Sequence, residues 1–291
     1  MRLFLFGAGY SAKAFARKMK GEAERIDGTT RHEENFAALE EAGIAPLLFG
    51  GEATSPAMPD RLVGSTHVVI SISPGETGDP AVAAVTQALQ RPGNSIRWIG
   101  YLSTVGVYGD HGGEWVDETA PCKPTSRRSR ERVEAEQAWT DLCQRHGIPL
   151  AILRLSGIYG PGRNAFVNLE RGTARRIVKQ DQVFNRIHVE DIAGVLRFLA
   201  RSDTGGVFNV TDSEPSPPQD VVAYAAELMG VTPPPEVPFE TAELTAMARS
   251  FYSENKRVSN ARIRGLGYEF AYPDYRTAFS AMWRDGNWRA G

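Results

Sequence analysis

A short apolar run that passes directly into a glycine-rich turn constrains this chain more than any other feature. Residues 3–6 are Leu-Phe-Leu-Phe, and the next six are Gly7-Ala-Gly9-Tyr-Ser-Ala12, before a helical stretch that continues to about Lys20. A strand that is apolar at every position is typical of a buried parallel sheet, and the glycines permit a tight turn into a helix. The pattern predicts a strand–turn–helix unit whose backbone N–H groups can hold the pyrophosphate of a dinucleotide.

The residues of this turn have different roles in a dinucleotide-binding site. The first glycine lets the chain leave the strand, the second lets the backbone approach a pyrophosphate, and the alanine lets the helix pack on the strand. We therefore predict that the cofactor contacts Gly7, Gly9, Tyr10, Ser11 and Ala12.

The composition is that of an ordinary globular protein of 291 residues. Charged residues make up 23% and apolar residues 42%, and the net charge of −2 gives no overall attraction to nucleic acid or to an anionic membrane. No apolar run approaches the roughly 20 residues of a membrane helix, and no signal peptide precedes the first strand. The two cysteines lack metal-ligand spacing. We expect a cytoplasmic protein with a small-molecule substrate, no metal, and no nucleic-acid or membrane partner.

Strands alternate with helices through the first two hundred residues, which predicts an α/β fold with a doubly wound parallel Rossmann sheet. The expected strands are residues 3–6, 23–27, 45–49, 67–72, 96–102, 149–155 and 207–210. The expected helices are residues 10–20, 35–42, 81–90, 126–146, 192–200 and 219–229, with Asp191 as the cap of the helix at 192–200.

Proline becomes frequent after residue 213, which indicates a second, smaller part of the chain. We predict a dinucleotide-binding Rossmann domain of residues 1–162 plus 186–212, and a small C-terminal substrate lobe of residues 163–185 plus 213–291. Ligands of an open α/β sheet bind beyond the carboxyl ends of the strands, so the informative residues should lie in the loops that follow them.

The loop after the second strand bears on which dinucleotide is bound. An NAD site usually has an acidic residue near this strand end to hold the ribose 2′-hydroxyl, and Asp27 is close, although the direction of its side chain stays open. Thr30 and Arg31 suit a 2′-phosphate better, because a guanidinium binds phosphate through two hydrogen bonds. We therefore expect NADP in preference to NAD, with Ser71 and Ser73 at the end of the fourth strand lining the same site.

Several motifs follow the fifth expected strand in a fixed order. They are Thr104 through Tyr108-Gly109, Arg154 through Tyr159-Gly-Pro-Gly-Arg163, Ile-His-Val-Glu-Asp at 187–191, and Arg-Val-Ser-Asn through Tyr-Pro at 257–273. In these motifs, over nearly its whole length, the chain resembles the extended short-chain dehydrogenase/reductase family, the NAD-dependent epimerase/dehydratase group.

The resemblance implies hydride chemistry, but the chain departs from the family at the pair of residues that performs it. Where the family has Tyr-x-x-Ser-Lys-x-x-x-Glu, alignment of Ser129 and Glu134 with the family's Ser and Glu places Ser126 at the tyrosine and Arg130 at the lysine. A serine is far less acidic than the tyrosine that transfers the proton. An arginine can hold the cofactor's ribose hydroxyls but does not exchange a proton near neutral pH.

The other candidates are the hydroxyls, phenols and charges of the neighbouring loops. Thr104 matches the family's hydroxyl that orients a substrate carbonyl. The groups that could replace the missing tyrosine are Tyr108, Tyr101, Tyr159 and His111. Arg163 and Tyr159 are expected to bind the substrate, with Arg163 on an anionic group.

Two functions are consistent with these residues. The first is an atypical NAD(P)-dependent oxidoreductase or epimerase/dehydratase-like enzyme for a small polar substrate of the sugar or nucleotide-sugar type, with Thr104, Tyr108, Ser126 and Arg130 as catalytic residues. The second is a non-catalytic NAD(P)-binding redox sensor or scaffold, which Ser126 in the tyrosine position favours. Family members often dimerise through the helix that begins here near Ser126, so a homodimer is an open expectation.

Overall fold

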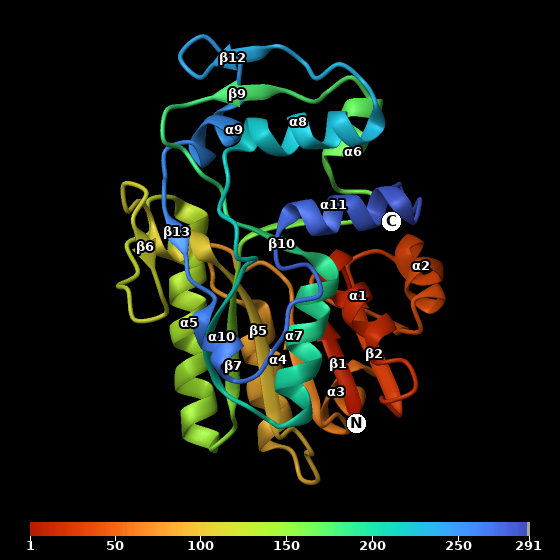
Figure 1. The fold of residues 1–291 in the computed structure, drawn as a ribbon. Coiled ribbons are helices and arrows are strands. Elements are labelled where there is room, and N and C mark those ends of the chain that lie inside the picture. Colours follow the sequence, from red (N-terminus) through yellow and green to blue (C-terminus); the bar gives the residue numbers. More distant parts are fainter. Residues whose placement is uncertain (290–291) are drawn as a thin grey trace. The chain divides into compact units, whose positions relative to one another are not determined.

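The computed structural model describes residues 1–289, apart from the side chain of Met247, and the chain forms two compact units (Figure 1). The first unit comprises Met1–Val107, Ser126–Arg154 and Ile192–Phe208. The second comprises Tyr108–Thr125, Leu155–Asp191 and the chain from Asn209 onward. Residues 108–125, expected in the dinucleotide-binding domain, group with the second unit because the backbone N–H groups of His111 and Gly113 donate to the Asn255 carbonyl oxygen.

A seven-stranded sheet has the strand order β11-β7-β5-β4-β1-β2-β3. Its strands are β1 (Arg2–Phe6), β2 (Arg25–Thr30), β3 (Ala45–Leu48), β4 (His67–Ile70), β5 (Trp98–Thr104), β7 (Leu150–Leu155) and β11 (Gly206–Val210). The pairs β1–β2, β1–β4, β2–β3 and β4–β5 are parallel, which confirms the predicted parallel α/β sheet. Chain order reverses at β1, and ligands of such sheets bind outside the carboxyl ends of the strands at this point.

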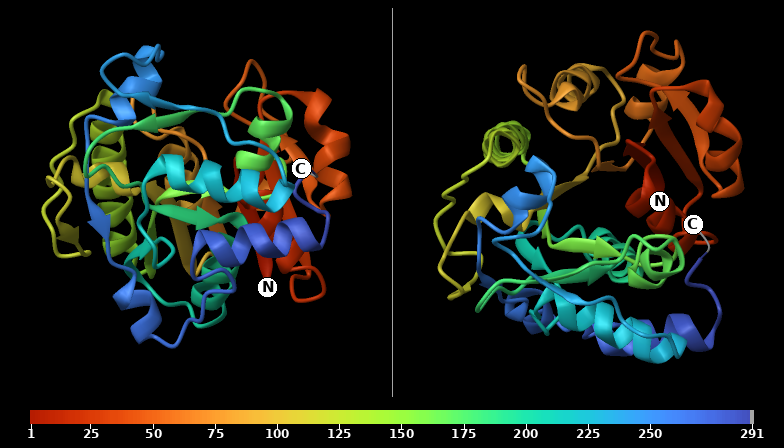
Figure 2. Two further views of the ribbon diagram at one scale, coloured as in Figure 1. Left: turned by 45° about the horizontal axis from the view of Figure 1, so that its top comes forward. Right: turned by 90° about the horizontal axis from the view of Figure 1, so that it is seen from above.

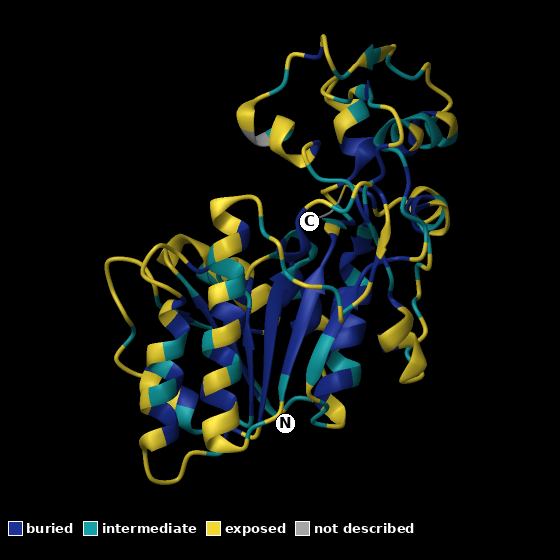
Figure 3. Ribbon diagram, turned by 90° about the vertical axis from the view of Figure 1, so that its left-hand side faces the viewer, coloured by how far each residue is buried: buried dark blue, intermediate teal, exposed yellow. Residues whose placement is uncertain are grey.

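Helices cover both faces of this sheet, so most residues of its strands are buried (Figure 3). Ile99 and Tyr101 of β5 join a core with α3 (Met58–Val63), α4 (Pro80–Gln90) and α5 (Arg127–His146). Gly100 between them faces the other side, where an added Cβ would lie 3.5 Å from Leu196 of α7 (Val189–Arg201). The helices α1 (Tyr10–Lys18) and α2 (Phe36–Glu41), with the short turn η1 (Glu33–Asn35), connect the first three strands.

The second strand lies later in the chain than residues 23–27, where the sequence analysis expected it. Gly28 does not end the strand but allows it to pack closely, since an added Cβ would lie 2.5 Å from Ile44 and 3.1 Å from Ala8. The two β-branched threonines that follow extend the strand. As a result Thr30, and not Asp27, is the last residue of β2.

The expectation that Asp191 caps a helix at 192–200 is wrong, because α7 already begins at Val189. The fully buried carboxylate of Asp191 instead accepts hydrogen bonds from the backbone N–H groups of Ala271 (2.8 Å) and Tyr272 (2.9 Å). It also accepts one from the Tyr268 hydroxyl at 3.1 Å. Asp191 thus anchors the segment 268–272 within the second unit.

The second unit is built from short parallel strand pairs and five helices among the described residues. The strands are β6 (Trp115–Val116) with β13 (Arg257–Val258), β8 (Gly157–Tyr159) with β10 (Arg186–His188), and β9 (Arg176–Val178) with β12 (Glu236–Pro238). The helices are α6 (Ala165–Glu170), α8 (Pro218–Met229), α9 (Ala246–Phe251), α10 (Ala261–Gly265) and α11 (Tyr275–Arg284). Helices α8 and α11 lie side by side (Figure 2) and share an apolar core with Phe166 of α6 and Trp288.

The described residues lack two features that would bear on function. None of its helices is long and apolar enough to cross a membrane. Residues 1–289 also contain no group of three or more His, Cys, Asp or Glu side chains that could hold a metal ion. Cys143 is a buried free thiol, and burial raises its pKa to about 12.

Candidate functional site

The turn after β1 has the backbone geometry that the sequence predicts. Gly7 has a φ of +83°, and a Cβ at this position would lie 2.6 Å from the side chain of Ile72. Its N–H donates to Thr29 Oγ1 at 2.9 Å, and the N–H of Ser71, directly after β4, donates to the Phe6 carbonyl oxygen at 2.8 Å. The ends of β1, β2 and β4 are therefore joined around a position that only glycine fits.

The beginning of α1 is open to an anion. Gly9 caps the helix without a side-chain hydrogen bond, and the first turn contains no acidic residue. Gly9 is exposed, and an added Cβ there would meet nothing within 4 Å. Tyr10 is half-buried, whereas Ser11 and Ala12 are buried against the sheet. The N–H groups of an uncapped first turn attract phosphate, so these residues fit a dinucleotide pyrophosphate.

The end of β2 carries a cation and a hydroxyl but no carboxylate. Thr30 Oγ1 accepts from Asn35 Nδ2 at 3.2 Å, and Arg31 is exposed and forms no ion pair within the described residues. Asp27 lies inside the strand, 1% exposed, where its Oδ2 accepts from Arg25 Nε at 2.5 Å. Burial raises the pKa of the Asp27 carboxyl, and the Arg25 cation opposes the rise. The Asp27 side chain, whose direction the sequence left open, therefore pairs with Arg25.

Arg132 of α5 connects the carboxyl ends of β4 and β5. Its Nη1 donates to the carbonyl oxygens of Leu102 (2.9 Å) and Ile72 (3.3 Å) and to the Tyr101 hydroxyl (3.0 Å). Its Nη2 donates to Ser73 Oγ at 3.2 Å. Burial raises the pKa of Tyr101 to about 12 against the opposing effect of the Arg132 cation, so this phenol stays protonated. Sequence reasoning did not single out Arg132.

A buried ion pair fixes the rotation of α5 against the sheet. Arg154 of β7 donates to both oxygens of the Glu136 carboxylate, through Nη2 at 2.7 Å and Nε at 3.2 Å. Ser103 of β5 donates to Glu136 Oε1 at 2.5 Å. Residues three and four apart lie on one face of a helix, so Ser129 and Arg132 lie on the same sheet-facing stripe as Glu136. Glu134, used in the sequence alignment, is exposed.

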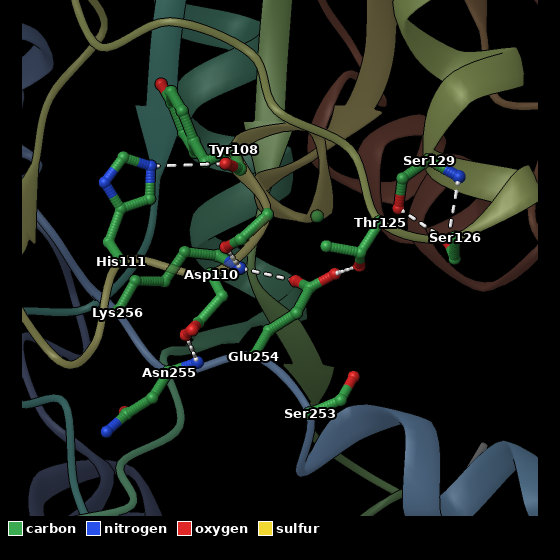
Figure 4. Close-up of polar contacts among 12 residues, drawn as sticks. Tyr108, Asp110, His111, Thr125, Ser126, Ser129, Ser253, Glu254, Asn255 and Lys256 are labelled. Atoms are coloured by element: carbon green, nitrogen blue, oxygen red, sulfur yellow. Dashed lines mark hydrogen bonds and ion pairs between the residues drawn. The ribbon is translucent and has the colours of Figure 1, made fainter.

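Ser126 and Arg130 are exposed, unlike Ser129 and Glu136 of that stripe. Ser126 is the exposed N-cap of α5, and its Oγ accepts from the Ser129 backbone N–H at 3.1 Å (Figure 4). Arg130 is exposed on the same first turn, and its backbone N–H donates to the Ser126 carbonyl oxygen. The assignment of Ser126 and Arg130 to catalysis stays a prediction, and the rotation of α5 offers Ser129 and Arg132 in their place.

Thr104 and Ser129 present hydroxyls to the same glycine. Thr104 is the last residue of β5, and its Oγ1 accepts from the Gly106 backbone N–H at 3.1 Å. A Cβ built on Gly106 would lie 3.0 Å from Ser129 Oγ and 3.4 Å from Thr104 Oγ1. Any larger residue at 106 would therefore push against both hydroxyls.

In the second unit, Tyr108 is not available to a ligand in this conformation. The side chain, at the end of the short turn η2 (Val105–Tyr108), is fully buried, and its hydroxyl donates to Asn209 Oδ1 at 2.7 Å. Its carbonyl oxygen accepts from His111 Nε2 at 3.2 Å (Figure 4). Both candidates thus have structural hydrogen bonds, and their assignment as acids stays a prediction.

Residues 254–256 hold the loop that follows Tyr108. The buried Lys256 ammonium donates to the Gly109 carbonyl oxygen and to Glu254 Oε2, both at 2.6 Å (Figure 4). The Glu254 carboxylate also accepts from the Thr125 hydroxyl. Asp110 accepts from the Asn255 backbone N–H at 2.7 Å, and this bond lowers the pKa of Asp110. The sequence analysis missed these residues because their partners are more than a hundred positions away.

Of the two substrate-binding candidates, only Arg163 is exposed. It ends a turn in which its backbone N–H and that of Gly160 exchange hydrogen bonds with each other's carbonyl oxygens. Tyr159 packs in the second unit's core, 5.7 Å from the Phe279 ring and 5.3 Å from the His188 ring. Burial raises the pKa of Tyr159 and lowers that of His188 to about 4.

Comparison with known proteins identifies the family. The model of the NAD dependent epimerase/dehydratase family matches residues 81–211. Residues 81–211 of the chain belong to this family. A solved structure of a conserved protein of unknown function from Silicibacter pomeroyi is 50% identical, covers 98% of this chain and 99% of its own, and superposes with a TM-score of 0.87.

Two further matches extend over the whole chain. Protein YeeZ of Escherichia coli K12 is 26% identical over 284 residues, which is 94% of this chain and 97% of YeeZ. A structure of a candidate NAD-dependent epimerase/dehydratase from Methylobacillus flagellatus is 25% identical, covers 98% of both chains and has a TM-score of 0.71. The expected resemblance to the epimerase/dehydratase group is thereby confirmed, and the family is an NAD(P)-dependent one.

In this epimerase/dehydratase family member, the polar stripe of α5 reads Ser129, Arg132 and Glu136, and it contains no tyrosine. The stripe can orient loops and donate hydrogen bonds, but a phenol that transfers a proton is absent from it.

Proposed function

We propose that this protein binds NAD(P)(H) at the beginning of α1 and acts as an oxidoreductase or epimerase/dehydratase-like enzyme. Its substrate would be a small polar carbonyl or hydroxyl compound of the sugar or nucleotide-sugar type. The observation that best supports this proposal is the beginning of α1, which follows Gly7 and Gly9 and has no side-chain cap. The same unit contains the hydroxyls of Thr104 and Ser129.

The residues present fit the cofactor. The cradle residues Gly7, Gly9, Tyr10, Ser11 and Ala12 would hold the pyrophosphate, and Ser71 and Ser73 would line the site beside them. The bound nicotinamide would supply or accept a hydride. Arg132 positions the loops after β4 and β5, and Thr104 would orient the reacting oxygen.

Arg31 and Thr30 support NADP over NAD in this proposal, because a guanidinium and a hydroxyl pair with a 2′-phosphate and no carboxylate occupies the end of β2. Titration of NADPH and NADH by nucleotide fluorescence tests this. Arg31→Ala should weaken NADPH binding about tenfold or more and leave NADH binding unchanged. The exposed Arg17, at the other end of α1, provides the control Arg17→Ala. Equal loss for both nucleotides, or none, would reject Arg31 as the specificity residue.

The second candidate is a non-catalytic NAD(P)-binding redox sensor or scaffold. The observation that favours it is the absence of a tyrosine on the sheet-facing stripe of α5, together with the complete burial of Tyr101 and Tyr108. Hydride exchange over a panel of carbonyl compounds and nucleotide sugars separates the two. Turnover that Thr104→Ala abolishes supports the enzyme, whereas tight NADPH binding without turnover supports the sensor.

The proposal also includes a cytoplasmic location and a homodimer formed through α5. Light scattering coupled to size-exclusion chromatography tests the dimer. Reversal of the charge at the exposed Arg128 of α5 tests whether this helix forms the dimer interface.

A further inference from the structure

A chain of two hydroxyls runs from the surface of α5 to its buried side. Ser126 is exposed, and its hydroxyl donates to Ser129 Oγ at 2.9 Å (Figure 4). Ser129 is 8% exposed, and no acceptor of its own proton is found among the described residues. The direction of the first bond leaves the Ser129 proton free to be donated onward.

The inner end of this chain lies beside the end of β5. Ser129 Oγ approaches Gly106, and Thr104 Oγ1 approaches the same residue. The Thr104 hydroxyl accepts from the Gly106 N–H, which leaves its proton free as well. The absence of a side chain at 106 therefore keeps two hydrogen-bond donors close together where the family's substrate oxygen is expected.

We propose that Ser126 and Ser129 form a proton relay that replaces the tyrosine of the family. This inference rests on the proposed hydride chemistry. A hydride from the bound nicotinamide would form the new C–H bond at the substrate's carbonyl carbon with its own electron pair. The electron pair of the C=O π bond would form the new O–H bond with the Ser129 proton. Ser129 takes the Ser126 proton and Ser126 takes one from bulk water, so both serines end neutral and the nicotinamide is oxidised.

A relay removes the objection that serine is a poor acid. Neither hydroxyl has to lose a proton before it gains another, because each passes one proton while it accepts the next. The backbone N–H of Ser129 donates to Ser126 Oγ at 3.1 Å and holds the outer hydroxyl in place. The exposure of Ser126 supplies the water contact that the relay needs. Thr104 then holds the substrate oxygen without transferring the proton.

The test compares variants that separate proton transfer from helix capping. Ser129→Ala removes the inner hydroxyl. Ser126→Asp retains an N-cap acceptor but has no proton to pass on at neutral pH, and Ser126→Ala removes both functions. The measurements are kcat with the best carbonyl substrate of the panel in H₂O–D₂O mixtures, the NADPH dissociation constant and the urea unfolding midpoint.

The relay predicts that Ser129→Ala lowers kcat about 100-fold and Ser126→Asp at least about tenfold, with NADPH affinity unchanged. The wild-type proton inventory should be curved, as expected for two protons in motion, and the curvature should disappear in Ser129→Ala. Wild-type turnover with full activity of Ser129→Ala would overturn the relay and leave the proposed function intact. No wild-type turnover with any substrate would overturn both.

Discussion

Acidification should destabilise this protein through His188, and the effect can be isolated by one substitution. The His188 side chain is 1% exposed, and its Nδ1 accepts from the Glu190 backbone N–H at 3.3 Å. Its buried Nε2 has no hydrogen-bond partner among the described residues, so nothing in the core stabilises a positive charge there. Burial therefore lowers the pKa of His188 to about 4 from its ordinary value of 6.5.

The lowered pKa of His188 determines whether stability rises or falls with pH. Between pH 6.5 and pH 4 the unfolded chain binds a proton at this residue and the folded chain does not, so stability falls as the pH falls. At 1.36 kcal/mol for each pKa unit, the full contribution is about 3 kcal/mol, of which about 2 kcal/mol is lost between pH 7.5 and pH 5.0. Asp212 acts in the opposite direction, because burial raises the pKa of its carboxyl to about 8 and its contribution is lost as the pH rises.

The contribution of Asp212 and of all other groups cancels when the pH dependence of the unfolding free energy of His188→Asn is subtracted from that of wild type. Asparagine keeps an acceptor for the Glu190 N–H but does not titrate. Urea unfolding at several pH values from 7.5 to 5.0 should show wild type losing about 2 kcal/mol more than the variant. The exposed His32 provides the control His32→Asn, which should follow wild type. Parallel pH profiles for wild type and His188→Asn would refute the reasoning.

Three further predictions concern the packing around the site. Arg154→Met should destabilise the fold by about 3–5 kcal/mol in urea unfolding, because it leaves the Glu136 carboxylate buried without its cation. A cost below 1 kcal/mol would show that the pair does not fix α5. Lys256→Met should increase hydrogen exchange and protease cleavage in residues 109–125, with protection of α4 unchanged as the internal reference. Gly28→Ala should cost about 1–3 kcal/mol through contact with Ile44; an unchanged unfolding midpoint would contradict the packing of β2.

The first strand and turn could be predicted from sequence because local constraints determine them. Four consecutive apolar residues directly before a glycine-rich turn are typical of a buried strand, and Gly7 has the positive φ that such a turn requires. The end of β2 was harder to predict from the sequence, because glycine usually weakens a strand. Here tertiary contact overrides that tendency, since Gly28 lies where Ile44 leaves no room for a Cβ.

The register of α5 could not be read from spacing, for a physical reason. Its sheet-facing side near the site is polar, so apolar periodicity does not identify that side. Glutamate occurs at positions 131, 134 and 136 of the helix, and the alignment through Ser129 and Glu134 does not indicate that Glu136 is the buried one. Glu136 is the buried one because it pairs with Arg154, and this contact between two separate elements cannot be read from the spacing within the helix. Asp191 was misread similarly, because the N–H groups it binds lie 80 residues later.

The most direct test of the dinucleotide cradle is NADPH binding to Gly9→Val. Gly9 is exposed, has a negative φ, and has nothing within 4 Å of an added Cβ, so the substitution should leave the urea midpoint unchanged. The new side chain would occupy the space through which a pyrophosphate approaches α1. Fluorescence titration should give tight NADPH binding to wild type and to the control Gly265→Val, and binding weakened at least about 100-fold in Gly9→Val. Wild-type affinity in Gly9→Val, or no binding by wild type, would contradict the account.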